Sequence, residues 1–515
     1  MVRTRFIYDS IIMILVNIFV RIIDFAYEVV LSKFLGPEGI GLFQISTTTL
    51  MVFLSITTSG IPMSVTKLVA EENAKRNHKN VETIYSTTIL LNLCISILLS
   101  IVIVLFSDFI AINIFKNKEM IYGVYLLVPA LIIMSITRVL ESFFYGMKNM
   151  IIPSIAEIIE STARLIIITT IFYYFSNTNP IYGAMIAILG ISIGELCDLI
   201  WSLLSKNKTR ISRSKENIFS GFSIRFAAKI LFMSLPLMAS GFFSIILKFI
   251  NTIMIPSRLM IAGYTNKSAM EVFGRITGMA MPLIHLPFMV TSAVVINLIT
   301  SLSRDMVLKN FNKIKSDIQL TIKVTLLISL PLMSLLIVFS KTLSIFLYND
   351  PQVGEYIRIL GYGTVLSALQ YTLSGILFGI GKEVDATRNR LLGLILRVIL
   401  IYFLVGDPKL HIYGFFIAFY MSNILILILD IISLKRSVDV KFNCFDILGK
   451  PLIGSIFMIG YIQLSTYDIK NLPNISIFNF IFILGIAFLS YLLILIITKA
   501  IPNDIIGRIT KNIVD

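Results

Sequence analysis

Cysteine, histidine and charged residues are all scarce in this chain. Of its 515 residues, 14% are Asp, Glu, Lys or Arg, and there are three Cys and three His. Cys94, Cys197 and Cys444 lie far apart, so they form neither a CxxC pair nor a metal-ligand spacing. We interpret them as packing residues or free thiols, and we expect no disulfide framework, no metal centre and no cofactor.

Long polar segments are also absent. Only short loops separate the apolar runs, and the longest of them, residues 206–226, is basic and rich in Ser and Asn. A membrane glycosyltransferase or polymerase would need a large loop outside the membrane or a surface cluster of carboxylates and histidines. Because neither feature is visible, the sequence predicts a protein that is not an enzyme.

Apolar residues dominate instead. They make up 57% of the chain and give a mean hydropathy of +0.89, whereas soluble domains are ~45–50% apolar. Because ~20 apolar residues cross a bilayer, we predict an all-α, polytopic integral membrane protein with ~14 transmembrane helices. The short run 391–406 and the loosely bounded pair at the C-terminus leave thirteen or twelve helices open. The predicted helices are 8–32, 42–66, 85–106, 121–146, 152–175, 181–204, 227–254, 274–302, 318–340, 356–378, 391–406, 411–433, 450–466 and 476–499.

The net charge is +15, and the basic residues that produce it are distributed unevenly among the loops. Lys and Arg gather in alternate loops, including 67–79, 206–225, 304–315 and 435–450, and are sparse in the loops between them. By the positive-inside rule the basic loops and both termini are cytoplasmic. The excess charge therefore indicates topology and contact with anionic membrane lipids rather than nucleic-acid binding.

A weak internal repeat divides the chain. Four pairs recur at offsets of 231–233 residues: Gly146 and Gly379, Arg164 and Arg397, "IYGAMIA" (181–187) and "IYGFFIA" (412–418), and "DLIWSL" (198–203) and "DIISL" (430–434), which pairs Asp198 with Asp430. We predict an N-terminal lobe of six helices (1–205), a cytoplasmic linker (206–226) and a second six-helix lobe (227–434). Residues 435–515 would add two further helices and a tail. Such duplicated lobes are typical of transporters that bind substrate between the repeats.

Charged residues inside the predicted helices are the candidate site. On a helical wheel Arg21, Asp24 and Glu28 form one stripe about 60° wide, and intramembrane charges usually face a cavity or a substrate path. The other candidates lie on the fourth, fifth and eighth predicted helices: Arg138, Glu141, Glu157, Glu160, Arg164 and Arg275. The alternative is that these residues form interhelical salt bridges or reach the interface without binding a ligand. We favour that alternative for Glu195, Asp198, Asp430 and Lys248.

Four segments in order carry a resemblance to a known family. They are "FLGPEGIGLFQ" (34–44), "TTSGIPMSVTKLVAEENAKRN" (57–77), "FFYGMKNMIIPSIAEIIESTARL" (143–165) and "VFGRITGMAMPLIHLPFMVTSAV" (272–294). Together they resemble the stage V sporulation protein B and polysaccharide-biosynthesis flippase branch of the multidrug, oligosaccharidyl-lipid and polysaccharide exporter superfamily. The resemblance runs from about residue 5 to residue 500 and implies fourteen helices, with two six-helix lobes around a central cavity.

This resemblance also implies a function. The expected substrate is an undecaprenyl-diphosphate-linked glycan, moved from the inner to the outer leaflet of the bacterial plasma membrane during cell-wall or spore-cortex synthesis. Arg21 would bind the diphosphate while Asp24 and Glu28 hold its guanidinium, and the last two helices would receive the polyprenyl tail. A cation-coupled multidrug antiporter of the same fold is the alternative.

The first helix departs from the lipid II flippases of this superfamily. Their motif reads approximately Arg-x-x-Gly-Phe-Ala-Arg-Asp, and Arg21 and Glu28 match its first arginine and its final acid. Tyr27 replaces the second arginine, and the segment 52–60 carries no charge. Arg275 is the nearest candidate for the arginine of the eighth helix, although it lies out of register. The resemblance therefore implies a less basic cavity than that of a lipid II flippase.

Overall fold

The computed structural model is built from helices. It describes residues 2–175, 179–208, 221–439, 443, 445–467 and 477–500, and no strand occurs in these ranges. Most of the predicted 206–226 linker, the tail after residue 500 and Cys444 lie outside the described residues. Eight of the described helices are long and apolar enough to cross a membrane. The predicted all-α membrane fold is therefore confirmed, while the count of fourteen spans stays a prediction.

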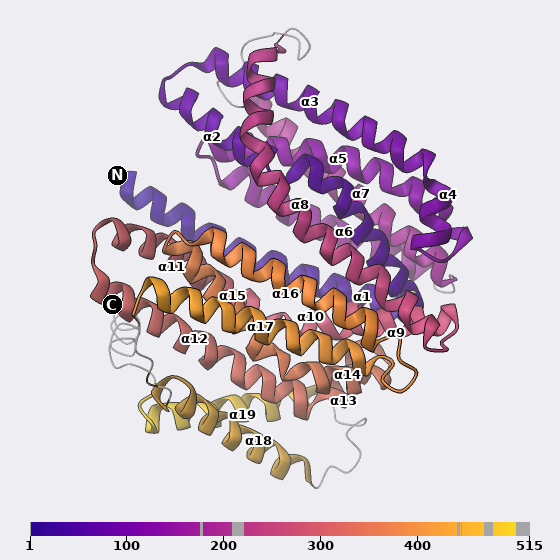
Figure 1. The fold of residues 1–515 in the computed structure, drawn as a ribbon, viewed down its shortest axis with the longest axis vertical. Helices are drawn as coiled ribbons and strands as arrows, with labels where there is room; N and C mark the ends of the chain where they lie inside the picture. Colours follow the sequence, from indigo (N-terminus) through magenta and orange to yellow (C-terminus); the bar gives the residue numbers. More distant parts are fainter. Residues whose placement is uncertain are drawn as a thin grey trace. The chain divides into compact units, whose positions relative to one another are not determined.

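Two packed units make up the chain, whose helices are labelled in Figure 1. The first unit comprises Met1–Gly278 with Val398–Gly414, and the second comprises Met279–Arg397 with Phe415–Asp515. The first contains α1 (Val2–Thr58), α2 (Ile61–Ala74), α3 (His78–Leu105), α4 (Ser107–Phe109), α5 (Ile121–Gly146), α6 (Ile151–Tyr174), α7 (Pro180–Lys208), α8 (Ile224–Ile261) and α9 (Asn266–Gly274). The division into lobes at residues 205 and 227 stays a prediction from the sequence repeat.

The second unit holds the later helices. The π-helical turn Arg275–Ala280 crosses from the first unit to the second, and the later helices are α10 (Met281–Ile284), α11 (Leu286–Val307), α12 (Phe311–Val338), α13 (Ser340–Tyr348), α14 (Gln352–Gly361), α15 (Gly363–Gly379), α16 (Glu383–Leu404), α17 (Tyr413–Ser437), α18 (Lys450–Tyr467) and α19 (Ile477–Ile497). The end of α16, from Val398, and the start of α17, up to Gly414, belong to the first unit. Helices α18 and α19 pack on each other and on α12 (Figure 1) through buried Met458, Ile462 and Tyr491. The Tyr491 hydroxyl donates a hydrogen bond to the carbonyl oxygen of Leu327 at 2.9 Å, which ties α19 to α12.

Helix α1 is kinked at a Gly-Pro pair, Gly36 and Pro37. Gly36 adopts a φ of 64° and a ψ of −179°, and Pro37 follows it. Glycine tolerates a positive φ, and proline donates no amide hydrogen to the preceding turn. The predicted runs 8–32 and 42–66 are therefore joined across a kink. The second run ends early, because α1 stops at Thr58 and α2 begins at Ile61 with Pro62 in its first turn.

The predicted helix 274–302 is also interrupted. It becomes the π-helical turn, α10 and α11, with the α-helical geometry broken at His285. Pro282 and Pro287 flank this point, and each removes one amide donor from the helical ladder. By contrast, Pro129, Pro236 and Pro331 lie within α5, α8 and α12, which are continuous. The presence of a proline therefore does not by itself predict where a helix of this chain is interrupted.

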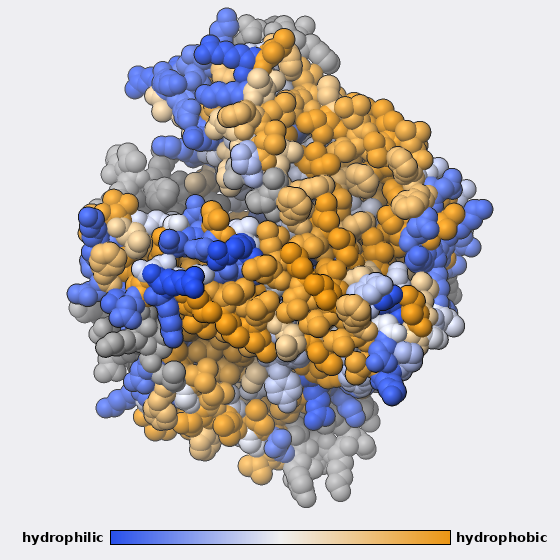
Figure 2. Space-filling model, in the orientation of Figure 1, coloured by the Kyte–Doolittle hydropathy of each residue, from blue (hydrophilic) through white to orange (hydrophobic). Residues whose placement is uncertain are grey.

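Apolar surface covers the helices of the first unit. On α3, the exposed side chains of Leu98, Ile101 and Leu105 recur at three- and four-residue spacing along one face. Figure 2 shows hydrophobic side chains over these helices and hydrophilic side chains gathered at helix ends. Extended apolar surface of this kind marks contact with a membrane or with a partner protein. On helices of membrane-spanning length, we interpret it as the surface that faces lipid.

Helices α1 and α9 approach closely at glycines. A Cβ on Gly274 would overlap the carbonyl oxygen of Pro37 and lie 2.8 Å from the backbone nitrogen of Gly41. A Cβ on Gly41 would lie 2.6 Å from the carbonyl oxygen of Met270. The obstacles are backbone atoms, which cannot rotate away, so small residues are required on both helices.

Substitution of Gly274 by Ala should therefore lower stability by about 1–3 kcal/mol, the usual cost of overpacking. The measurement is thermal unfolding of the purified protein in detergent. Gly460 in α18 is the matched control, because no atom lies within 4 Å of a Cβ placed there. Gly460→Ala should be neutral or slightly stabilising, since alanine is the better helix former. Equal melting temperatures for the two variants would contradict the close approach.

Candidate functional site

The candidate residues fall on three helices and one turn of the first unit. Arg21, Asp24 and Glu28 lie on α1, Arg138 and Glu141 on α5, and the triplet at 157, 160 and 164 on α6. Helices α1, α5, α6 and α7 pack against one another. The structure thus brings most of the predicted residues into one region, which we call the charged network: Asp24, Arg138, Glu141, Glu160, Arg164, Glu195 and Asp198.

Arg138 forms the first half of the charged network. One of its guanidinium nitrogens donates to both oxygens of Glu141, at 2.7 and 2.9 Å. Its other terminal nitrogen lies 3.3 Å from Glu195 of α7. Glu195 is fully buried and also accepts a hydrogen bond of 2.8 Å from the Thr137 hydroxyl. Arg138 therefore links α5 to α7.

Arg164 forms the second half. Its Nη2 lies 2.7 Å from Asp24 of α1, and its Nη1 lies 3.3 Å from Glu160, one turn earlier on α6. The Ser161 hydroxyl donates a further hydrogen bond of 2.9 Å to the same oxygen of Asp24. The guanidinium carbon lies 4.9 Å from the centre of the Tyr27 ring, a cation–π distance. Arg164 therefore joins α6 to α1.

This arrangement corrects one prediction. The sequence suggested that Asp24 holds the guanidinium of Arg21, but Asp24 is paired with Arg164 instead. Arg21 is exposed, and within the described residues no carboxylate lies within ion-pair distance of it. The difference arises because α6 packs against the Asp24 face of α1, a tertiary contact that the helical wheel of α1 alone does not contain.

The remaining candidates lie outside the ion pairs of the charged network. Glu28 and Glu157 are partly buried, and neither forms an ion pair with a side chain in the described part of the chain. Arg275 begins the π-helical turn, and its Nη1 lies 3.5 Å from Glu271 on α9. Arg275 is therefore at least partly neutralised by an acid of its own segment.

Asp198 is the residue that the sequence interpretation undervalued. It is fully buried on α7, one turn after Glu195, and its Oδ1 accepts a hydrogen bond of 2.9 Å from Ser202. Carboxylate oxygens of Glu160, Glu195 and Asp198 all lie within 4.8 Å of one another. The three-residue spacing of Glu195 and Asp198 was the available signal, but their proximity to Glu160 depends on the packing of α7 against α6.

The repeat partners in the second unit have neutral surroundings. Arg397 donates to the Ser422 hydroxyl at 2.8 Å and to the Asn423 side-chain oxygen at 3.3 Å. Asp430 accepts from Asn389 at 2.9 Å and from Ser374 at 3.0 Å. Arg164 and Asp198, their counterparts in the first unit, lie among carboxylates. The two repeats therefore keep related positions but have different electrostatics.

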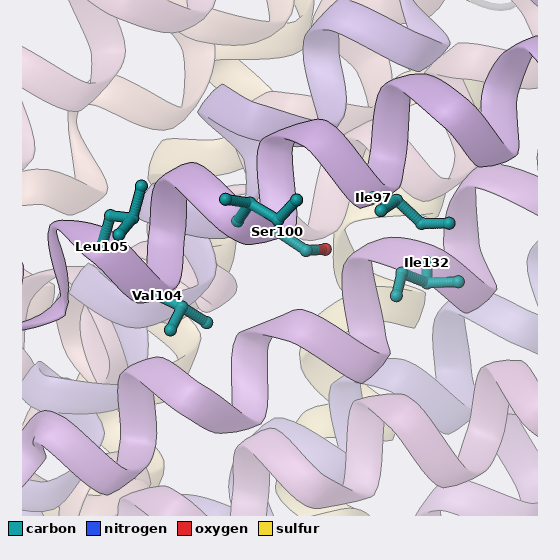
Figure 3. A pocket seen from close by; sticks show the side chains of 6 residues that line it. Ile97, Ser100, Val104, Leu105 and Ile132 are labelled. Atoms are coloured by element: carbon teal, nitrogen blue, oxygen red, sulfur yellow. The ribbon is translucent and has the colours of Figure 1, made fainter.

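A shallow groove of about 250 Å³ lies away from the charged network. Figure 3 shows its lining from α3 and α5: Ile97, Ser100, Ile101, Val104, Leu105 and Ile132. The groove offers apolar surface and no charged side chain. It suits a hydrocarbon chain rather than a phosphate or a sugar.

Comparison with known proteins gives a family match over more than half of the chain. The model of the family described as polysaccharide biosynthesis protein matches residues 7–299, and that of the MatE family matches residues 244–403. Stage V sporulation protein B of Bacillus subtilis (strain 168) is 23% identical over 516 aligned positions, covering 99% of this chain and 98% of that protein.

Two solved structures show a similar fold. The lipid II flippase MurJ, in an inward closed conformation, matches with a TM-score of 0.73 and 18% identity, covering 96% of this chain and 100% of the other. A multidrug resistance MATE family transporter of the MOP superfamily, in an inward-facing conformation, matches with a TM-score of 0.67 and 14% identity over 89% and 99%. At these identities the likeness concerns the fold.

Proposed function

Because the chain belongs to the polysaccharide biosynthesis protein family, we propose that it is a flippase for a polyprenyl-diphosphate-linked glycan. The glycan would be a cell-wall or spore-cortex precursor or a polysaccharide unit, moved from the inner to the outer leaflet of the bacterial plasma membrane. The relative named stage V sporulation protein B and the fold of a lipid II flippase support this substrate class.

The observation that carries the proposal is the contrast among three arginines on helices of the first unit: Arg21 on α1, Arg138 on α5 and Arg164 on α6. Arg138 and Arg164 are each shared by two carboxylates, so their donors are largely occupied. Arg21 is exposed and forms no ion pair with the described acids. A guanidinium binds phosphate through two parallel hydrogen bonds. Arg21 is therefore the arginine that a diphosphate group can reach without displacing a protein partner.

The other candidate residues have supporting roles in this proposal. Arg138, Glu141, Glu160 and Arg164 fix the helices around α1, while Glu28 adds negative charge near Asp24 and Arg164, and Glu157 adds it near Arg138 and Glu141. Excess negative charge near the site favours release of an anionic headgroup after transport. Arg275 would provide a second, weaker contact, because Glu271 already lies beside it.

A multidrug antiporter is the second candidate function. The MatE match over residues 244–403 and the fold of a MATE transporter favour it, as does the excess of carboxylates in the charged network. An antiporter of cationic drugs should bind its substrate through carboxylates, and it would leave exposed Arg21 without a role.

Reconstitution separates the two candidates. Purified protein in liposomes should move a fluorescent undecaprenyl-diphosphate-linked glycan between leaflets and should not expel a cationic dye under an ion gradient. Empty liposomes and liposomes that carry an unrelated membrane protein are the controls. Dye efflux without glycan movement would support the antiporter and exclude the flippase.

The charge sorting gives a topological prediction. A single cysteine introduced in the 206–226 loop should react with a membrane-impermeant thiol reagent only after the membrane is opened, because basic loops stay inside. A cysteine introduced within 262–267 should react in intact cells. Both are measured in a background in which Cys94, Cys197 and Cys444 are replaced by Ser. The reverse labelling pattern would overturn the assignment of cytoplasmic termini.

A further inference from the structure

Three carboxyl groups meet inside the first unit with too little positive charge to neutralise them. Glu160 comes from α6, and Glu195 and Asp198 come from α7; the three are 7%, 0% and 0% exposed. Carboxylate oxygens of all three lie within 4.8 Å of one another. Bringing several carboxylates together in a buried site is unfavourable unless each charge is compensated.

The arginines compensate for only part of this charge. Arg138 is shared by Glu141 and Glu195, and Arg164 is shared by Asp24 and Glu160. Asp198 has no ion pair with the described residues. Around the three acids, further acidic groups outnumber the two arginines: Asp24 on α1, Glu141 and Tyr145 on α5, and Glu157 on α6, beside Arg138 and Arg164. Tyr27 and Glu28 of α1 interact with Asp24 and Arg164 rather than directly with the three acids.

A second observation points to a bound species. The Oδ2 atom of Asp198 is buried and accepts no hydrogen bond from the part of the chain that the structure describes. Ser202 satisfies only the other oxygen. A buried carboxylate oxygen without a donor is costly, whereas a proton on that oxygen turns it into a donor for a neighbouring carboxylate.

We propose that Glu160, Glu195 and Asp198 form a proton-binding site in which neighbouring carboxyl groups share a proton. The proton comes from water and returns to it, and no covalent bond between heavy atoms changes. Ca²⁺ or Mg²⁺ fits less well, because each takes at least six oxygen ligands. Arginine nitrogens already lie 3.3 Å from both glutamates. The site does not depend on the proposed transport substrate.

Asp430 supplies an internal control for this proposal. It occupies the equivalent position in the sequence repeat and is equally buried, but both of its oxygens accept hydrogen bonds from neutral groups. Its negative charge is therefore stabilised by donors, and no second carboxyl group is required to share a proton with it.

Infrared difference spectroscopy of the purified protein tests the site directly, because a protonated carboxyl group has its own C=O absorption. The wild-type spectrum should contain a carboxylic-acid band that is lost as pH rises, and Asp198→Asn should remove one carboxyl group from that band. Asp430→Asn should leave it unchanged. Ser202→Ala should shift the band without removing it, because Ser202 donates to Asp198, and this variant keeps the test valid if Asp198→Asn folds poorly.

Two outcomes would overturn the proposal. The first is a pH-dependent carboxylic-acid band that is identical in wild type, Asp198→Asn and Ser202→Ala. The second is a site occupied by sodium, shown by a carboxylate band that responds to sodium at constant pH and is lost in Asp198→Asn. Loss of glycan transport alone would not bear on proton binding, so failure of the proposed function is distinguishable from failure of this site.

Discussion

Arg21→Ala should reduce flipping of a lipid-linked glycan by roughly tenfold to a hundredfold, the effect of losing a charge-assisted hydrogen bond worth about 1.5–3 kcal/mol. Its abundance and melting temperature should stay near those of the wild type. Arg21 is exposed and is not paired with Asp24, so its removal leaves no described acid without a partner. Removing an intramembrane charge also does not impair insertion of the helix.

The conservative variant sharpens this prediction. Arg21→Lys should retain partial activity, because the positive charge remains while the planar fork that binds phosphate bidentately is lost. Both variants are measured by initial flipping rate in liposomes at matched protein density. A folded Arg21→Ala protein with wild-type flipping would exclude Arg21 as the phosphate-binding group.

Arg164→Ala should have the largest effect on stability. It leaves the carboxylates of Asp24 and Glu160 without their shared partner, and breaking a buried ion pair in this way costs about 3–5 kcal/mol. Asp24 is 42% exposed and Arg164 is 17% exposed. Solvent therefore offsets part of the cost, and we expect a value near the lower end of that range. The measurement is thermal unfolding in detergent, with Arg21→Ala as the control that should barely change.

A compensating variant distinguishes charge from packing. Adding Asp24→Asn and Glu160→Gln to Arg164→Ala removes both orphaned charges while nearly keeping side-chain volume. Most of the lost stability should return, because the penalty comes from uncompensated carboxylates. No recovery in the triple variant would indicate that Arg164 stabilises the protein by packing against Tyr27 rather than by its charge.

The sequence predicted which residues belong to the charged network better than it predicted which of them form ion pairs with one another. The three- and four-residue spacing of Glu157, Glu160 and Arg164 places them on one face of α6, and Glu160 and Arg164 form an ion pair on that face. The link from Arg164 to Asp24 could not be predicted from the sequence, because it depends on how α6 and α1 are rotated when they pack. The same limit explains the wrong assignment of Asp24 to Arg21.

Helix boundaries show a similar limit. Apolar runs predicted both ends of α5, α6 and α7 to within four residues, whereas α3 and α12 begin seven residues before their predicted runs, in polar sequence. The runs 42–66 and 274–302 are interrupted in the structure, at Ser59–Gly60 and near His285. Hydropathy detects membrane-length apolar segments but does not detect breaks within them. Those breaks depend on backbone geometry at glycine and proline and on the packing of neighbouring helices.

Binding of undecaprenyl diphosphate to purified wild type and Arg21→Ala tests the central claim most directly, because it separates phosphate recognition from transport. Native mass spectrometry can count the bound lipid, with undecaprenyl monophosphate and undecaprenol as matched controls for the tail. Wild type should prefer the diphosphate over both controls, and Arg21→Ala should lose that preference by roughly tenfold to a hundredfold. Equal binding of the diphosphate to both proteins, or a wild type that does not distinguish it from undecaprenol, would contradict the account.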